Sequence, residues 1–154
     1  MVRYVPVFLL LVLMSVPAPA YAQDPVVSGT TSLLAQGKYE PLDGVEITVY
    51  RKAPAGQTKS KGLGAFSVSF AAGTPVQVLF RGPKGELPAL QSLKADRGTT
   101  HDVHVTLFTV EDAKKAGINV YSYIRALIDQ LLASGVDPKD PQILSLRDLM
   151  NKYG

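Results

Sequence analysis

Apolar and polar side chains alternate along most of the chain between residues 26 and 107, and this pattern limits the possible folds more than any other feature. In one run, Val45, Ile47 and Val49 alternate with Glu46 and Thr48. Alternation with a period of two predicts β-strands that bury one face. Seven strands are therefore expected, near 26–34, 45–50, 57–60, 66–70, 76–81, 90–95 and 102–107.

Turn-forming residues separate these runs. Asp43-Gly44 precedes one run, Gly62 and Gly64 precede the next, and Gly73-Thr74-Pro75 opens another. Glycine permits positive φ and proline removes a backbone donor, so such clusters interrupt strands. Short strands at this spacing are typical of two packed sheets, and we predict a mainly β fold, a seven-stranded antiparallel β-sandwich. The chain has no cysteine, so its stability must come from a buried core and not from disulfides.

Helical signals replace the alternation at Thr109. Thr109-Val110-Glu111-Asp112 resembles a capping box. Asn119 can cap a second helix, in which apolar residues recur with helical spacing over 120–132, and Asp140-Pro141 is typical of a third helix start. We therefore predict two to three α-helices in a C-terminal tail. Helices this short do not persist alone in water, so their apolar stripes must be buried. They could pack on the sandwich or on each other, or they could contact a partner protein or a second copy of the chain.

The N-terminal residues have the pattern of a secretory signal peptide. Arg3 precedes an apolar run at 5–16, and Ala20-Tyr21-Ala22 supplies the small residues of a cleavage site before Gln23. A membrane span needs about 20 apolar residues, more than this run offers. We expect a signal peptide at 1–22, a β-sandwich at 23–108 and a helical tail at 109–154. The mature protein would be periplasmic or extracellular, with no membrane span.

Three stretches of the sandwich region resemble the carboxypeptidase regulatory-like family, also called transthyretin-like or prealbumin-like sandwiches. They are Pro-Leu-Asp-Gly-Val-Glu-Ile-Thr-Val-Tyr at 41–50 with Ser-Gly-Thr at 28–30, Gly-Ala-Phe-Ser-Val at 64–68, and Ala-Gly-Thr-Pro-Val-Gln-Val at 72–78. The resemblance implies a transthyretin-like fold and an accessory role in folding, adhesion or protein contact. Some relatives of this fold bind carbohydrate.

The sequence offers little support for catalysis, a metal or a cofactor. His101 and His104 are three residues apart, and on a strand such positions face opposite sides, which argues against a shared metal ion. A serine nucleophile acting with His104 and Asp102 would lack the Gly-x-Ser-x-Gly elbow. The formal net charge of +3 is too small to indicate nucleic acid as a partner. We predict no catalytic, cofactor-binding or metal residues.

The candidate binding surface consists of two tyrosines and two basic residues, which are Tyr39, Tyr50, Arg51 and Lys52. Tyr50 is expected on an outward strand face and Tyr39 in a loop, where exposed aromatic rings could contact a ligand. The chain has no tryptophan, so a sugar-stacking platform would be weak. We therefore predict an exported, non-catalytic module that binds a protein, and alternatively a carbohydrate-binding or envelope-associated structural protein. The oligomeric state stays open.

Overall fold

The structure is a computed structural model that describes residues 23–154, and it contains eight strands and three helices in this range. The predicted signal peptide at 1–22 and the Ala22 side of its cleavage site lie outside the described residues. The strands are β1 (Val26–Ala35), β2 (Lys38–Pro41), β3 (Glu46–Tyr50), β4 (Pro54–Lys59), β5 (Ala65–Ser69), β6 (Gly73–Arg81), β7 (Ala89–Ala95) and β8 (Thr100–Phe108). The helices are α2 (Val110–Lys115), α3 (Val120–Ala133) and α4 (Pro141–Asn151).

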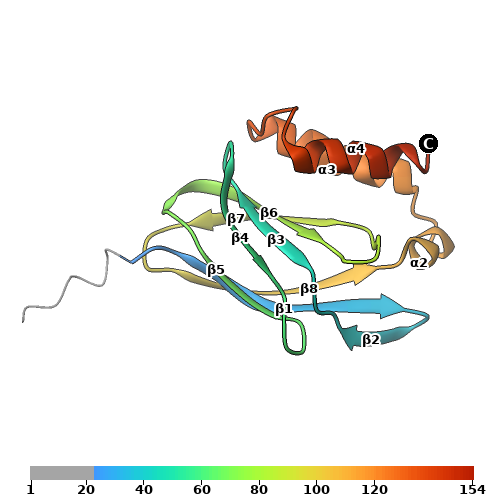
Figure 1. Ribbon diagram of the computed structural model, residues 1–154, viewed down its shortest axis with the longest axis horizontal. Coiled ribbons are helices and arrows are strands. Elements are labelled where there is room, and N and C mark those ends of the chain that lie inside the picture. Colours follow the sequence, from blue (N-terminus) through green and yellow to red (C-terminus); the bar gives the residue numbers. More distant parts are fainter. Residues whose placement is uncertain (1–22) are drawn as a thin grey trace, which may run out of the picture.

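The strands form two four-stranded sheets that face each other (Figure 1). In the first, which we call the open sheet, β1 lies between β8 on one side and β5 and β2 on the other. The second, which we call the covered sheet, has the order β4-β3-β6-β7. The inward residues of both sheets make one apolar core, in which the rings of Phe66 and Phe80 meet edge to face at 5.8 Å. The prediction of a mainly β sandwich is confirmed.

The predicted number of strands is wrong, because the structure adds β2. This strand lies in a segment expected to be a loop, since Lys-Tyr-Glu-Pro is only four residues long, contains no β-branched residue and buries neither face. It pairs with the end of β1 through a tight turn at Gln36 and Gly37, which both have positive φ. Two-residue hairpin turns of this kind suit the twist of the flanking strands. The hairpin geometry, and not strand propensity, therefore creates the eighth strand.

The prediction that all pairings are antiparallel is also wrong in one place. Strands β1 and β8 run parallel over nine residue pairs, from Val26 with Thr100 to Leu34 with Phe108. The remaining pairings within residues 23–154 are antiparallel. Apolar alternation says which face of a strand is buried but nothing of its direction relative to a partner far away in sequence. Parallel strands need a long connection, and here nearly the whole sandwich separates the two.

The helical tail forms a third layer, with α3 and α4 lying over the outer face of the covered sheet (Figure 1). Ile124, Leu131 and Ile143 of the helices share a second apolar cluster with Tyr50 and Leu79 of the sheet. Of the alternatives left open for the apolar stripes, the structure shows the first, because the helices pack on the sandwich and on each other. Each helix also begins as the sequence predicts, because an N-cap side chain accepts a backbone N–H: Thr109 from Asp112, Asn119 from Ser122, and Asp140 from Gln142.

Candidate functional site

The four residues of the predicted binding surface are not brought together. Tyr39 belongs to β2 in the open sheet, whereas Arg51 and Lys52 follow β3 in the covered sheet. Figure 1 shows the tip of the β3–β4 hairpin at the top of the view and β2 at the lower right, on different sheets. A single ligand of ordinary size cannot bridge these two places, so the surface divides into separate parts.

Tyr50 is buried, and the prediction that it faces solvent is wrong. Its side chain points to the outer face of the covered sheet, as its position in the alternation requires, but α3 and α4 cover that face and leave it 0% exposed. Its hydroxyl donates a hydrogen bond of 2.8 Å to Oδ1 of Asp140. Burial, together with this carboxylate, raises the pKa of Tyr50 well above its ordinary value. Tyr50 holds the tail on the sheet and cannot stack on a ligand.

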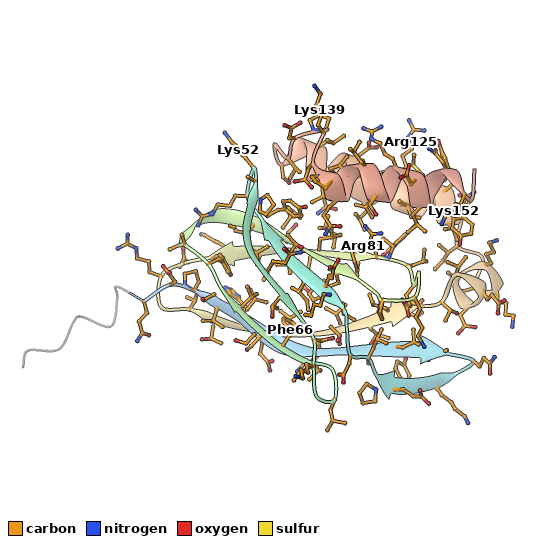
Figure 2. The ribbon with its side chains drawn as sticks, viewed as in Figure 1. Lys52, Phe66, Arg81, Arg125, Lys139 and Lys152 are labelled. Atoms are coloured by element: carbon orange, nitrogen blue, oxygen red, sulfur yellow. The ribbon has the colours of Figure 1, made fainter. Side chains whose placement is uncertain are left out.

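Arg51 and Lys52 lie where the β3–β4 hairpin approaches other segments. The Arg51 guanidinium donates to the carbonyl of Ala71, at the start of the segment that leads into β6. Lys52 is exposed and projects at the tip of the hairpin (Figure 2), and its aliphatic stem lies beside Gly135, which ends α3. These contacts indicate that Arg51 joins segments of the fold, and they leave Lys52 as a solvated surface charge.

Tyr39 is the one predicted residue that lies in a hollow with exposed apolar neighbours. Its side chain is 70% exposed, and across the hollow stands Leu63, which is 79% exposed. We call this hollow of about 220 Å³ the Tyr39 groove, and its lining is Thr30, Thr31, Ser32, Tyr39, Glu40, Pro41 and Leu63. The groove combines two projecting apolar side chains with hydroxyls and one carboxylate.

The turn that carries Leu63 is held firmly in place. Gly62, Leu63 and Gly64 all have positive φ, and the carboxylate of Asp43 accepts the N–H groups of Gly62 at 3.2 Å and Gly64 at 2.7 Å. The Gly64 carbonyl in turn accepts the N–H of Thr31 at 2.8 Å. A left-handed conformation costs a non-glycine residue about 1–2 kcal/mol. Leu63 is therefore presented to solvent at a conformational cost and gains no burial in return.

Leu63 is absent from the predicted surface because Gly-Leu-Gly has the pattern of an ordinary turn. A signal was present in the sequence, since a large apolar residue between two turn glycines cannot enter the core from the tip of a tight turn. Exposed apolar residues that cluster mark interaction surfaces more often than isolated ones do. What the sequence could not show is that this tip lies beside Tyr39.

The groove continues into the outer face of the open sheet, which is rich in hydroxyls. Oγ1 of Thr30 lies 2.8 Å from Nδ1 of His104, and Oγ of Ser32 lies 3.0 Å from Oγ1 of Thr106. His104 also contacts Asp102, with 3.3 Å between Nε2 and Oδ2. The side chains of His104 and Asp102 are 67% and 69% exposed, so most of their surface faces solvent. This setting favours surface polar contacts over an activated nucleophile, which needs an enclosed and oriented base.

His101 faces the other side of β8 and has its Nε2 buried. The two histidines therefore point away from one another across the sheet, as the strand spacing predicts. Within residues 23–154, no three histidine, aspartate or glutamate side chains gather in a group that could hold a metal ion. In the same range, none of the helices is long and apolar enough to cross a membrane.

Comparison with known proteins gives only distant similarities. No protein-family model matches the chain, and no curated protein matches it. Among solved structures it is similar to a minor pilin of the Gram-positive pathogen Streptococcus agalactiae, with 12% identity and a TM-score of 0.49 over 57% of this chain and 45% of the pilin. It is also similar to a 9R-lipoxygenase from Cyanothece, with 14% identity and a TM-score of 0.37 over 61% of this chain and 17% of the enzyme. At these scores neither likeness supports an inference about function.

Proposed function

We propose that the protein is an exported, non-catalytic interaction module that binds a protein partner through the Tyr39 groove. One observation carries the proposal: Tyr39 and Leu63 are the two most exposed large apolar side chains of the described residues, and they line the same hollow. Clustered exposure of this kind is unfavourable in a free protein unless something covers it. A partner with an apolar side chain for the hollow and polar groups for its rim would do so.

The groove has the properties of a protein-binding site. Tyrosine is enriched among the residues that contribute most to protein interfaces, because it offers a large contact area at low conformational cost. The backbone on both sides of Leu63 is already held by the Asp43 carboxylate, so the turn loses little backbone freedom on binding. Glu40 and the hydroxyls of Thr30 and Ser32 supply polar contacts around the apolar pair.

Two substitutions test the groove without damaging the fold. Leu63→Gly should raise the free energy of unfolding by about 1 kcal/mol, because glycine accepts the left-handed conformation, and should still weaken partner binding. Tyr39→Ala should weaken binding with little change in stability. Leu144→Ser is the matched control, since Leu144 is an exposed apolar residue on α4, away from the groove.

The readout is capture of proteins from the external medium or cell envelope on the immobilised protein, followed by affinity measurement with the purified partner. We expect a partner whose binding both groove variants weaken at least tenfold and Leu144→Ser leaves unchanged. A partner that binds all three variants alike would disprove the assignment to this groove. Unfolding curves measured in parallel separate lost binding from lost structure.

Export is supported by the segment that precedes the described residues. The apolar run and the Ala-Tyr-Ala site at its end are what a signal peptidase recognises. Mass spectrometry of the protein recovered outside the cytoplasm should give a mature chain beginning at Gln23. A protein that retains residues 1–22, or that stays in the cytoplasm, would contradict the proposal.

We further infer that the sandwich is a carboxypeptidase regulatory-like domain with the transthyretin-like fold. The stretches that carry the resemblance fall on strands of both sheets: 28–30 lies within β1, 41–50 includes β3, 64–68 forms most of β5, and 72–78 covers the first part of β6. Such domains are accessory modules, which agrees with a non-catalytic role. Superposition of an experimental structure on solved members tests the inference, and a different strand order would reject it.

Carbohydrate binding is the second candidate, and the polar lining of the groove supports it. An exposed ring at Tyr39 stands beside the carboxylate of Glu40 and the hydroxyl of Ser32, groups that can hydrogen-bond a sugar. Retention on immobilised polysaccharides distinguishes the two candidates. Binding of a sugar that stacks on Tyr39 should be lost in Tyr39→Ala and kept in Leu63→Gly. Binding of a protein partner should be weakened in both variants.

A further inference from the structure

Strand β8 has a long, unprotected edge in the open sheet. One side of β8 pairs with β1, and no strand within residues 23–154 pairs with its other side. The strand has nine residues and contains no proline, glycine, lysine or arginine. An edge of this kind presents a row of backbone groups that another strand can pair with.

The other strands with a free edge are β2, β4, β5 and β7, and β5 has only five residues. The remaining three carry further features that discourage such pairing. Strand β2 has only four residues and ends in Pro41, and β4 begins with Pro54 and ends with Lys59. Strand β7 contains Lys94, and its pairing with β6 is irregular. Short length, proline, lysine and irregular pairing all discourage an added strand. Strand β8 lacks all of these protections.

The backbone hydrogen bonds determine which residues of β8 face the free edge. The N–H of Val26 donates to the carbonyl of Thr99, so the odd-numbered residues of β8 bond to β1. The backbone N–H and C=O groups of the even-numbered residues then point away from β1, toward the free edge. These residues are Thr100, Asp102, His104 and Thr106. At the end of the strand the carbonyl of Phe108 already accepts the N–H of Leu87, which leaves 100–107 free.

We propose that this edge pairs antiparallel with β8 of a second copy of the chain, about a two-fold axis at Val103. The segment Thr-His-Asp-Val-His-Val-Thr at 100–106 is complementary to itself in this register. Thr100 lies opposite the partner's Thr106, and Asp102 lies opposite the partner's His104. By symmetry each pair occurs twice. Cross-strand threonine pairs and carboxylate–imidazole pairs both stabilise antiparallel ladders.

Neighbouring registers are less favourable for definite reasons. The backbone N–H and C=O groups at the free edge belong to even-numbered residues of β8. Hydrogen bonds to the second copy can therefore form only where an even-numbered residue lies opposite an even-numbered residue. A shift of the register by two residues in one direction places Asp102 opposite Asp102 of the second copy. Like charges directly opposite each other are destabilising. A shift the other way places Thr100 opposite Phe108, whose carbonyl is occupied by Leu87. The register about Val103 alone joins complementary side chains along the whole free segment.

The proposed dimer also has a consequence for the Tyr39 groove. A two-fold axis through an antiparallel pair stands perpendicular to the sheet, so the outer faces of both open sheets lie on the same side. The two grooves would then be displayed together, and a repeated partner could bind both at once with higher avidity. This consequence depends on the proposed function, whereas the pairing of β8 does not.

Introduced cysteines test the register directly, because the chain has no cysteine of its own. Under mild oxidation Val103→Cys should form a disulfide-linked dimer, since the two copies of residue 103 face each other about 4.5 Å apart between Cα atoms. Val105→Cys is the control on the same face of the strand. Its two copies would lie about 14 Å apart along the ladder, too far for a disulfide. Equal cross-linking of both variants would overturn the proposal.

Sedimentation equilibrium of the purified protein supplies the second test. The wild type should show a reversible monomer–dimer equilibrium, and His104→Asp, which puts two carboxylates opposite each other, should lower the association constant roughly tenfold. Combining Asp102→His with His104→Asp exchanges the pair and should restore the dimer. A protein that stays monomeric, or a double variant as weak as the single one, would refute the pairing, while circular dichroism confirms that each variant is folded.

Discussion

The outer faces of the two sheets come from the same kind of alternating sequence, but one is exposed to solvent and the other is buried. On the open sheet, outward residues such as Ser67, Asp102 and His104 are exposed. On the covered sheet, Gln77 and Leu79 occupy equivalent outward positions and are buried beneath α3 and α4. The alternation therefore identifies two faces of a strand and leaves undecided whether the outer one meets water. In this chain a tail of 46 residues, from 109 to 154, covers one sheet only.

The polar groups under the tail show how the covered face accommodates burial. Gln77 accepts a hydrogen bond from Ser92 at 2.8 Å, and the amide of Gln130 on α3 joins both of them. Arg81 extends from the sheet toward the helices (Figure 2). It donates to Gln142 at 3.2 Å and to Ser145 at 3.2 Å, both on α4. Burial lowers the pKa of Arg81 from its ordinary value. Buried polar groups need such partners, and the open face has no comparable requirement because water supplies them.

The largest expected difference in stability is between two single variants, each of which places a carboxylate on the outer face of one sheet. Leu79→Asp should destabilise the protein by about 4 kcal/mol or prevent folding, because the carboxylate would be buried between β6 and the helices. Ser67→Asp, at an outward position of β5, should change the free energy of unfolding by less than about 0.5 kcal/mol. Urea unfolding followed by circular dichroism compares them. Similar losses in both variants would mean that the two faces do not differ as described.

Shortening an apolar side chain of the tail should give a smaller difference in stability between a position that contacts the covered sheet and one that is exposed. Ile124→Ala removes a fully buried side chain from the cluster between α3 and the sheet and should cost about 2–4 kcal/mol. Leu144→Ala, at an exposed position of α4, should cost less than about 0.5 kcal/mol. Thermal unfolding measures both. If Ile124→Ala melted like the wild type, the tail could not be packed on the covered sheet.

The hydroxyl of Tyr50 tests whether a hydrogen bond helps to fasten the tail. Tyr50→Phe keeps the ring and removes the bond to Asp140, so the expected loss is about 1–2 kcal/mol. Tyr39→Phe removes a hydroxyl from an exposed ring on the open sheet and should have no measurable effect on stability. Chemical unfolding of both variants gives the comparison, and equal stability would mean that the Asp140 contact adds nothing.

Alkaline pH should weaken the covered face selectively. Burial raises the pKa of Tyr50 and of Tyr123, whose hydroxyl donates to the carbonyl of Pro88 at 2.6 Å. A raised pKa in the folded state means that stability is complete below the ordinary value of about 10 and falls as pH rises above it. The free energy of unfolding should therefore begin to decrease near about pH 10 and keep decreasing as the pH rises toward the raised pKa values of the folded state. The decrease should be smaller in Tyr50→Phe, and an identical decrease would exclude Tyr50 as a source.

The smallest expected effect concerns a contact on the open face. Ser32→Ala removes the hydrogen bond to Thr106 between β1 and β8, where water can replace it. The free energy of unfolding should change by less than about 0.5 kcal/mol. A loss above about 1 kcal/mol in chemical unfolding would show that the open face contributes more to stability than its exposure suggests.

Local chemistry in the sequence was sufficient to predict the main elements. Alternation identified β3, β5 and β6, because each strand side chain must face either the core or its opposite side. Capping residues located the starts of the helices, since Thr109, Asn119 and Asp140 satisfy N–H groups only a few residues away. The exposure of Tyr39 was also predicted, although it belongs to a strand and not to a loop.

Only the tertiary structure decided what depends on residues far apart in sequence. Tyr50 is buried because a helix 90 positions later in the sequence brings Asp140 onto it. Strand β8, the last of the sandwich in sequence, pairs in parallel with β1, the first. The Tyr39 groove exists because a hairpin places β2 beside the turn of Leu63. Periodicity and capping act over one strand or one helical turn, whereas burial of an outer face, strand direction and the meeting of two loops are set by packing between distant segments.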